Sequence, residues 1–235
     1  MKLSIGLALA ISLLVREDPG VGGSGAERAD EGPRRAGPSA DELLALTESC
    51  DPLPGVGKFK TDSRSPATVP ICRLNGAIWW RADADIDCDG GTSASCKDDP
   101  SYQATTSAKD SKGSFVDAST LPFLVVPLAG NGFDPKKLGI KTGWSGYGSA
   151  GAIIYDGQLL YVPYADAGPA GVIGELSQAA AARLGIPTSP RSGGVDSGVT
   201  YIVFTGPGSY VEPIESEAEA RALGERLARA LIQDN

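Results

Sequence analysis

The sequence contains no histidine among its 235 residues. This absence excludes Ser-His-Asp and Cys-His nucleophilic catalysis and removes the imidazole ligands that most protein metal sites use. A general acid or base in this chain must therefore come from Asp, Glu, Lys, Tyr or Cys.

The only long apolar run is short for a membrane span. It covers 13 residues, Leu3 to Val15, follows Lys2 and ends at charged residues, and a bilayer-spanning helix needs about 20 apolar residues. A basic start followed by a short apolar segment is typical of an export signal, although a buried cytoplasmic helix is the alternative. A small-residue cleavage site could lie at Ser24-Gly25-Ala26.

The four cysteines are consistent with export, because an even number can oxidise to two disulfides. Cys88 and Cys96 are close enough in sequence to pair locally, which would leave Cys50 with Cys72. The other two connectivities stay open.

Aromatic residues are also scarce, at 6%, whereas glycine reaches 31 residues. This balance favours a turn-rich β or α+β domain over a helix bundle. The net charge is −8, so the phosphate backbone of a nucleic acid is a poor partner. A polycationic substrate would be attracted, although acidity also serves solubility alone.

The pattern of Gly, Pro and apolar residues divides the chain into three parts. We assign 1–16 to a signal-like segment, 17–48 to a flexible linker with a short helix starting at Ser39, and 49–235 to the folded domain. The runs that predict strands are Thr68–Leu74, Ala77–Ala82, Phe123–Leu128, Ala152–Tyr155, Leu159–Tyr164 and Gly198–Gly206.

Turn and cap signals connect these runs. Asn75-Gly76 and Asp156-Gly157 predict two-residue hairpins, and helices are expected at Glu175–Leu184 and from Ser216 to about Ile232. On the second helix, Glu217–Arg221 and Glu225–Arg229 are expected to pair. We predict an α+β domain with a mostly antiparallel, barrel-like sheet and a few flanking helices.

Two carboxylates frame the most informative stretch, YVPYADAGPAGVIGELSQA (Tyr161–Ala179). Asp166 is expected in a loop after an apolar strand, and Glu175, nine positions later, at the start of a helix. Such a pair can cleave a glycosidic bond, because one carboxyl group protonates the leaving oxygen while the other activates water. The alternative is a pair of solvated loop acids.

A second stretch, WWRADADIDCDG (Trp79–Gly90), alternates four aspartates with small or apolar residues. A strand would place the four side chains on one face. A calcium loop is one interpretation, since Asp85, Asp87, Asp89 and Gly90 match the first positions of an EF-hand, but Cys96 stands where its last ligand is required. The other two are an amino-sugar subsite, with tryptophans stacking on sugar rings, and a solvated acidic turn.

Several segments together resemble the fungal-type chitosanases of glycoside hydrolase family 75. They are DADIDCDG (Asp83–Gly90), CKDDPSYQ (Cys96–Gln103), SFVDASTLPFLVVP (Ser114–Pro127), AIIYDGQLLYVPYADAGPAGVIGE (Ala152–Glu175) and GGVDSGVTYIVFTG (Gly193–Gly206). The resemblance extends from about Leu53 to Gly206 in consistent order, and IDCDG combined with the Asp…Ile-Gly-Glu pair is specific.

This resemblance implies an extracellular, inverting endo-hydrolase of β-1,4-linked glucosamine that needs no cofactor and no metal, built on a barrel similar to the six-stranded double-psi enzymes. The family's essential Asp and Glu correspond to Asp166 and Glu175. Chitosan is the implied partner; nucleic acid and, after signal removal, membranes are not, and we expect a monomer. The residues expected to bind substrate are Asp83, Asp85, Asp87, Asp89, Trp79, Trp80 and Tyr164.

Two other functions remain as alternatives: a non-catalytic, expansin-like polysaccharide-binding module and a calcium-stabilised adhesion domain. Within the catalytic interpretation, a helix N-terminus would lower the pKa of Glu175 and make it the base. Desolvation would then keep a proton on Asp166 as the acid.

Overall fold

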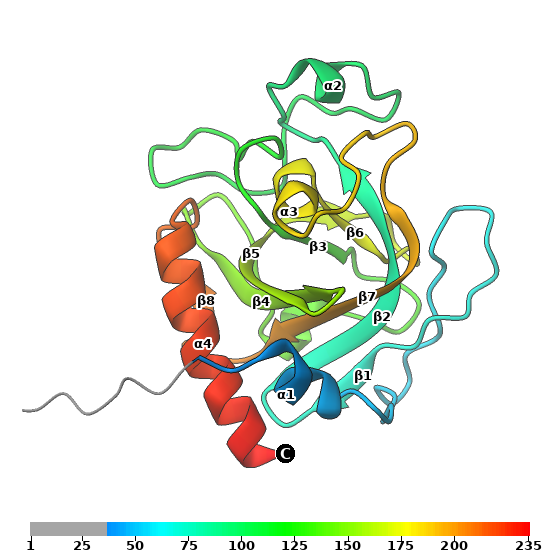
Figure 1. Ribbon diagram of the computed structural model, residues 1–235, viewed down its shortest axis with the longest axis vertical. Coiled ribbons are helices and arrows are strands. Elements are labelled where there is room, and N and C mark those ends of the chain that lie inside the picture. Colours follow the sequence, from blue (N-terminus) through cyan, green and yellow to red (C-terminus); the bar gives the residue numbers. More distant parts are fainter. Residues whose placement is uncertain (1–36) are drawn as a thin grey trace, which may run out of the picture. The chain divides into compact units, whose positions relative to one another are not determined.

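The computed structural model describes residues 37–235, and the proposed signal segment, its cleavage site and the first part of the linker lie outside these residues (Figure 1). Six strands close into a barrel. In order around it they are β2 (Ala77–Asp87), β6 (Glu175–Ser177), β3 (Leu124–Pro127), β5 (Gln158–Gly168), β4 (Gly148–Tyr155) and β7 (Val195–Phe204), which pairs back with β2. Outside it, β1 (Cys72–Leu74) extends β2 and β8 (Tyr210–Val211) extends β4.

The barrel contains both parallel and antiparallel strand pairs. The prediction of a mostly antiparallel sheet is therefore only partly correct. β6 runs parallel to β2, and β3 runs parallel to β5, whereas the hairpin-linked neighbours are antiparallel. Parallel pairing requires a long crossover, and strand prediction from local hydrophobic runs does not reveal which distant strands become neighbours. The α+β barrel itself is confirmed.

Large apolar side chains fill the barrel. Trp80 and Tyr201, from the paired strands β2 and β7, stack with ring centroids 5.4 Å apart, and both are fully buried. A second apolar layer lies on the outside of the sheet, where Trp79, Ile154 and Ile202 face the C-terminal helix. The first part of β2, Ala77–Trp80, is therefore buried on both of its faces, which explains the continuous apolar run there.

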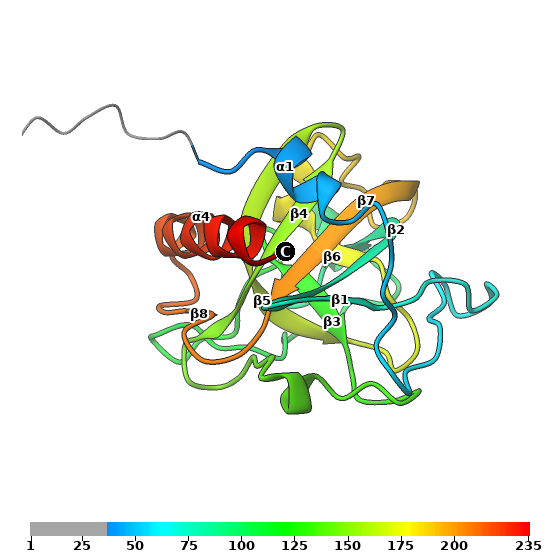
Figure 2. The same ribbon diagram turned by 90° about the horizontal axis from the view of Figure 1, so that it is seen from below.

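The C-terminal helix α4 (Glu217–Asp234) covers this outer layer together with α1 (Ala40–Ala45), as Figure 2 shows from below. Small residues on its buried face, including Ala220, Gly224 and Ala228, allow the close approach. A Cβ at Gly224 would lie 2.4 Å from the ring of Tyr161. Glu225 pairs with both Arg221 and Arg229.

The predicted turns and caps are largely present. Asp156 and Gly157 both adopt positive φ between β4 and β5, Ser39 forms the expected capping box with Glu42, and Ser216 caps α4. The segment from residue 37 to 48, which we assigned to the linker, belongs to the same compact unit as the barrel.

The helix predicted from Glu175 to Leu184 begins later than expected. Glu175–Ser177 form β6, and the helix α3 covers only Gln178–Arg183, with the Ser177 hydroxyl capping it. Two short elements, α2 (Ala94–Lys97) and a 3-10 turn at Pro135–Leu138, lie in the connections. No helix among residues 37–235 is long and apolar enough to cross a membrane.

Candidate active site

An open cleft of about 530 Å³ lies where β2, β5 and β6 meet, and acidic side chains dominate it. A second hollow of about 430 Å³ continues from it, sharing Asp89, Gln103 and the end of β5 with the first. The carboxylates that line the two hollows are Asp62, Asp85, Asp87, Asp89, Asp99, Asp166 and Glu175.

Asp166 lies on β5, two residues before the strand ends, and not in the loop after it as predicted. Its Oδ1 accepts hydrogen bonds from the backbone N–H groups of Ser107 at 2.7 Å and Ala167 at 2.9 Å. Burial raises the pKa of Asp166, and the hydrogen bonds from Ser107 and Ala167 oppose that rise because they stabilise the ionised form.

Glu175 is the first residue of β6, where it pairs with Asp85 of the parallel strand β2. Its Oε2 would lie 3.2 Å from a Cβ at Gly168. Since Gly168 and Asp166 are two positions apart on β5, they face the same side, and the Glu175 carboxyl group reaches the face that carries Asp166. Burial, followed by repulsion from Asp166, raises the pKa of Glu175 to about 8.

This pKa reverses our expectation for Glu175. We predicted a lowered pKa from a helix N-terminus, but α3 begins three residues later and its first turn is capped by Ser177. A strand end provides no comparable dipole, so the low-dielectric surroundings dominate.

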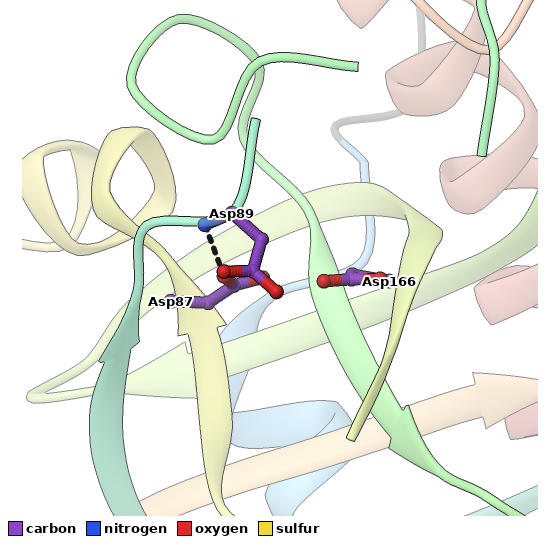
Figure 3. Close-up of side chains that lie close together, drawn as sticks. All are labelled: Asp87, Asp89 and Asp166. Carbon is purple, nitrogen blue, oxygen red and sulfur yellow. Dashed lines mark hydrogen bonds between the residues drawn. The ribbon is translucent and has the colours of Figure 1, made fainter. Parts of the chain in front are cut away.

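Asp87 is the last residue of β2 and Asp89 follows in the next turn. Both lie beside Asp166 of β5 (Figure 3). One oxygen from each of the three carboxyl groups lies within 4.8 Å of the other two. Asp89 accepts hydrogen bonds from the backbone N–H and the Nε2 of Gln103, at 2.7 and 2.6 Å. Burial nevertheless raises the pKa of Asp89 to about 6.

Asp83 and Asp85 diverge from this group. Asp85 is exposed and lines the cleft. Asp83 does not line it: its Oδ1 is buried without a hydrogen-bond partner and would lie 1.9 Å from a Cβ at Gly174. The four aspartates therefore do not all line the cleft, and the β2–β7 pairing has a bulge between Ala82 and Ala84, at the position of Asp83.

The predicted aromatic subsites are wrong. Trp80 is fully buried inside the barrel, Trp79 is buried on the outer face of the sheet, and Tyr164 is buried in the barrel core. A sugar ring needs an exposed aromatic face, and none of these three residues offers one.

The three grouped aspartates could each offer an oxygen to a cation, but the calcium-loop interpretation does not fit. Asp85 and Asp87 lie on β2 in extended conformation, and Cys96 is joined to Cys88, so the stretch does not form an EF-hand loop. In addition, N–H donors from Gln103, Ser107 and Ala167 already occupy oxygens of Asp89 and Asp166.

Both predicted disulfides, Cys50–Cys72 and Cys88–Cys96, are present. The second bridges the two sides of the turn that carries Asp89. Both of its cysteines are buried, so it stabilises the end of β2 at the cleft.

Several contributors were missed by the sequence interpretation. Ser107 and Gln103 hold Asp166 and Asp89 in place, and Asp62, Asp99 and Arg191 line the cleft from three separate loops. Gln103 belongs to one of the segments that carry the family resemblance, but Ser107 lies in a polar loop with no pattern that would single it out.

This chain is similar to several known proteins. The sequence profile of the fungal chitosanases of glycosyl hydrolase group 75 matches residues 84–229, more than half of the chain. Endo-chitosanase B of Aspergillus oryzae is 29% identical over 185 residues, which cover 67% of this chain and 75% of that protein. Among solved structures, the Streptomyces papain inhibitor matches 58% of this chain and 99% of its own, with 21% identity and a TM-score of 0.31.

Proposed function

The chain belongs to the fungal chitosanases of glycosyl hydrolase group 75, and from this premise we propose that it is a secreted, endo-acting and inverting chitosanase. Its substrate is the polymer of β-1,4-linked glucosamine. The observation that carries the proposal is the pair Asp166 and Glu175, brought to the same acidic cleft from neighbouring parts of the barrel.

The charge of the cleft supports a cationic substrate. Apart from Arg191, whose guanidinium donates to the backbone oxygen of Asp98, the charged groups that line the two hollows are carboxylates. The ammonium groups of glucosamine would supply the positive charge that these carboxylates lack. The two hollows are continuous and open, as a polymer cut at internal bonds requires.

The environments of the two carboxyl groups support opposite roles from those predicted. Glu175 has a pKa raised to about 8, so it carries a proton at neutral pH and can donate it to the leaving oxygen. Asp166 accepts two backbone N–H groups that favour its ionised form, which suits the base that activates water. We therefore assign Glu175 as the acid and Asp166 as the base.

A fluoride donor separates these roles, because fluoride leaves with little help from an acid. Glu175→Gln should lose chitosan hydrolysis by about 100-fold or more but keep much of its activity on a glucosaminyl fluoride, whereas Asp166→Asn should lose both. Survival of Asp166→Asn alone would reverse the assignment. The α-anomer as first product would support inversion, for which carboxyl groups about 6.5–9.5 Å apart are expected.

Endo action on chitosan is tested by viscosity and by reducing ends. A solution of chitosan should lose viscosity well before most of its linkages are cut. The hairpin variant Asp156→Asn, at an exposed position that does not line the cleft and has a positive φ that Asn tolerates, should keep full activity. If wild-type protein binds chitosan but releases no reducing ends, it is a non-catalytic binding module instead.

We also propose that the protein works extracellularly, as a monomer and without a cofactor. The two disulfides support an oxidising compartment. Gel filtration and intact mass of protein recovered from the culture medium test these points: free thiols or a stable dimer would contradict them.

A further inference from the structure

Asp87 is a buried acidic group to which the acid–base scheme gives no role. It ends β2 and is only 4% exposed. One oxygen, Oδ1, accepts the backbone N–H of Asp89 at 2.7 Å. The other, Oδ2, is buried and has no hydrogen-bond partner. An ionised carboxylate in this position would leave a buried charge without compensation.

The charged neighbours of Asp87 make ionisation harder. The carboxyl groups that act on it are Asp89 in the following turn, Asp166 on β5 and Glu175 on β6; Asp85 lies two residues earlier on its own strand. Burial, followed by repulsion from Glu175 and Asp166, raises the pKa of Asp87 well above its usual range. The cation that lines the cleft, Arg191, donates to a backbone oxygen instead.

The distribution of N–H donors shows where a proton is needed. Asp89 accepts two hydrogen bonds from Gln103, and Asp166 accepts two from the backbone, so both are stabilised as acceptors. Asp87 receives a single donor, on Oδ1. In Figure 3, Asp166 points from β5 toward Asp87 and Asp89, and one oxygen from each lies within 4.8 Å of the others.

We propose that Asp87 is a positioning residue. Its carboxyl group stays protonated on Oδ2 and donates a hydrogen bond, directly or through one water, to Asp166. The neutral acid converts a repulsive contact between carboxylates into a hydrogen bond. It would thereby orient Asp166 and favour its ionised form as the base. This inference rests on the chitosan hydrolysis proposed above.

The matched variants are Asp87→Asn and Asp87→Leu. Asparagine has the same shape, is neutral and can both donate to Asp166 and accept from Asp89, so it should keep kcat within about tenfold of wild type. Leucine has neither function and should lower kcat by about 100-fold with a smaller change in KM. Circular dichroism and urea unfolding would confirm that each variant folds.

The pH profile distinguishes positioning from a purely structural role. Loss of the donor removes a hydrogen bond to ionised Asp166, so its pKa rises and the acid limb of kcat/KM should move to higher pH in Asp87→Leu. In Asp87→Asn the limb should stay near its wild-type position. The control variants are Asp83→Asn and Asp83→Leu, because Asp83 is a buried acid on the same strand that does not line the cleft. Neither should shift the acid limb of kcat/KM.

Infrared difference spectra test the proton itself, independently of activity. Wild-type protein should show the carbonyl band of a protonated carboxylic acid at pH 7 that Asp87→Asn lacks, even when Glu175 has been replaced by Gln. Absence of that band would overturn the inference. So would an inactive but folded Asp87→Asn, since it would show that the ionised form is required, for example as a cation ligand. Failure of chitosan hydrolysis in wild type would instead refute the proposed function.

Discussion

Replacing the proposed catalytic acid should stabilise the folded protein at neutral pH. The pKa of Glu175 rises from 4.5 to about 8 on folding, chiefly because of burial. The folded chain therefore keeps a proton that the unfolded chain releases above pH 4.5, and stability falls as the pH rises from about 4.5 to about 8. Below pH 4.5 the effect disappears, because both states are protonated.

The magnitude follows from the same values. Each pKa unit corresponds to about 1.4 kcal/mol, so the interval between pH 4.5 and pH 7 corresponds to at most about 3–4 kcal/mol of unfolding free energy. Neighbouring carboxyl groups share part of this effect, and we expect Glu175→Gln to gain about 1–3 kcal/mol at pH 7 to 8. Glutamine is neutral throughout, so the gain should vanish near pH 4.

Urea unfolding of wild type and Glu175→Gln at pH 4, 6, 7 and 8 measures this difference. Asp117→Asn is a control for which we expect the opposite change in unfolding free energy. Although burial raises the pKa of Asp117, hydrogen bonds from Ser119 and Thr92 outweigh it and lower that pKa. This substitution should therefore destabilise the protein more at pH 7 than at pH 3. A Glu175→Gln gain that did not change with pH, or a loss at pH 8, would refute the reasoning.

Three further predictions concern the support of the cleft. Gly174→Ala should lose about 1–3 kcal/mol more stability than Gly171→Ala, because both glycines have positive φ but only at Gly174 would the new Cβ meet the Asp83 carboxyl group; equal losses would contradict the steric argument. Excess chelator should leave the melting temperature unchanged, and a drop of several degrees would indicate a bound cation. Replacing Cys88 and Cys96 by serine should cost about 2–3 kcal/mol and lower kcat, since their disulfide anchors the turn at the cleft; an unchanged kcat would show that the turn holds without it.

Local signals predicted the parts of the fold that local chemistry determines. The Asp156-Gly157 turn needs two residues that tolerate positive φ, and it has them. Ser39 and Ser216 supply side-chain oxygens at helix starts and cap them as expected. The order of strands and turns also predicted a barrel-like sheet, and the strand–loop–helix pattern singled out Asp166 and Glu175. The family resemblance added the six-stranded barrel type and the essential role of these two carboxylates.

The errors come from tertiary contacts that no local pattern encodes. Leu176, Ala180 and Leu184 have helical spacing, yet the first of them lies in β6 because that segment pairs with both β2 and β3. Trp79 and Trp80 suggested a sugar platform because they stand next to the alternating aspartates. Trp79 packs in the layer under α4 and Trp80 packs inside the barrel instead.

The acidic cleft would have to meet two opposite requirements in the proposed reaction. Ionised carboxylates would bind a cation, whereas one carboxyl group would have to keep a proton. The pKa values of Asp85, Asp87, Asp89 and Glu175 are all raised, and burial is the largest cause for each. A bound glucosamine polymer would bring ammonium groups to these carboxylates and favour their ionised forms. As the proposed catalytic acid, Glu175 would nevertheless have to keep its proton until the leaving oxygen takes it. Its place on β6, against Gly168, would keep it away from the ammonium groups that reach the exposed Asp85. In the proposed reaction, the separation of the exposed Asp85 from the partly buried Glu175, on paired positions of β2 and β6, would allow one acidic cleft both to attract a cation and to protonate a leaving group.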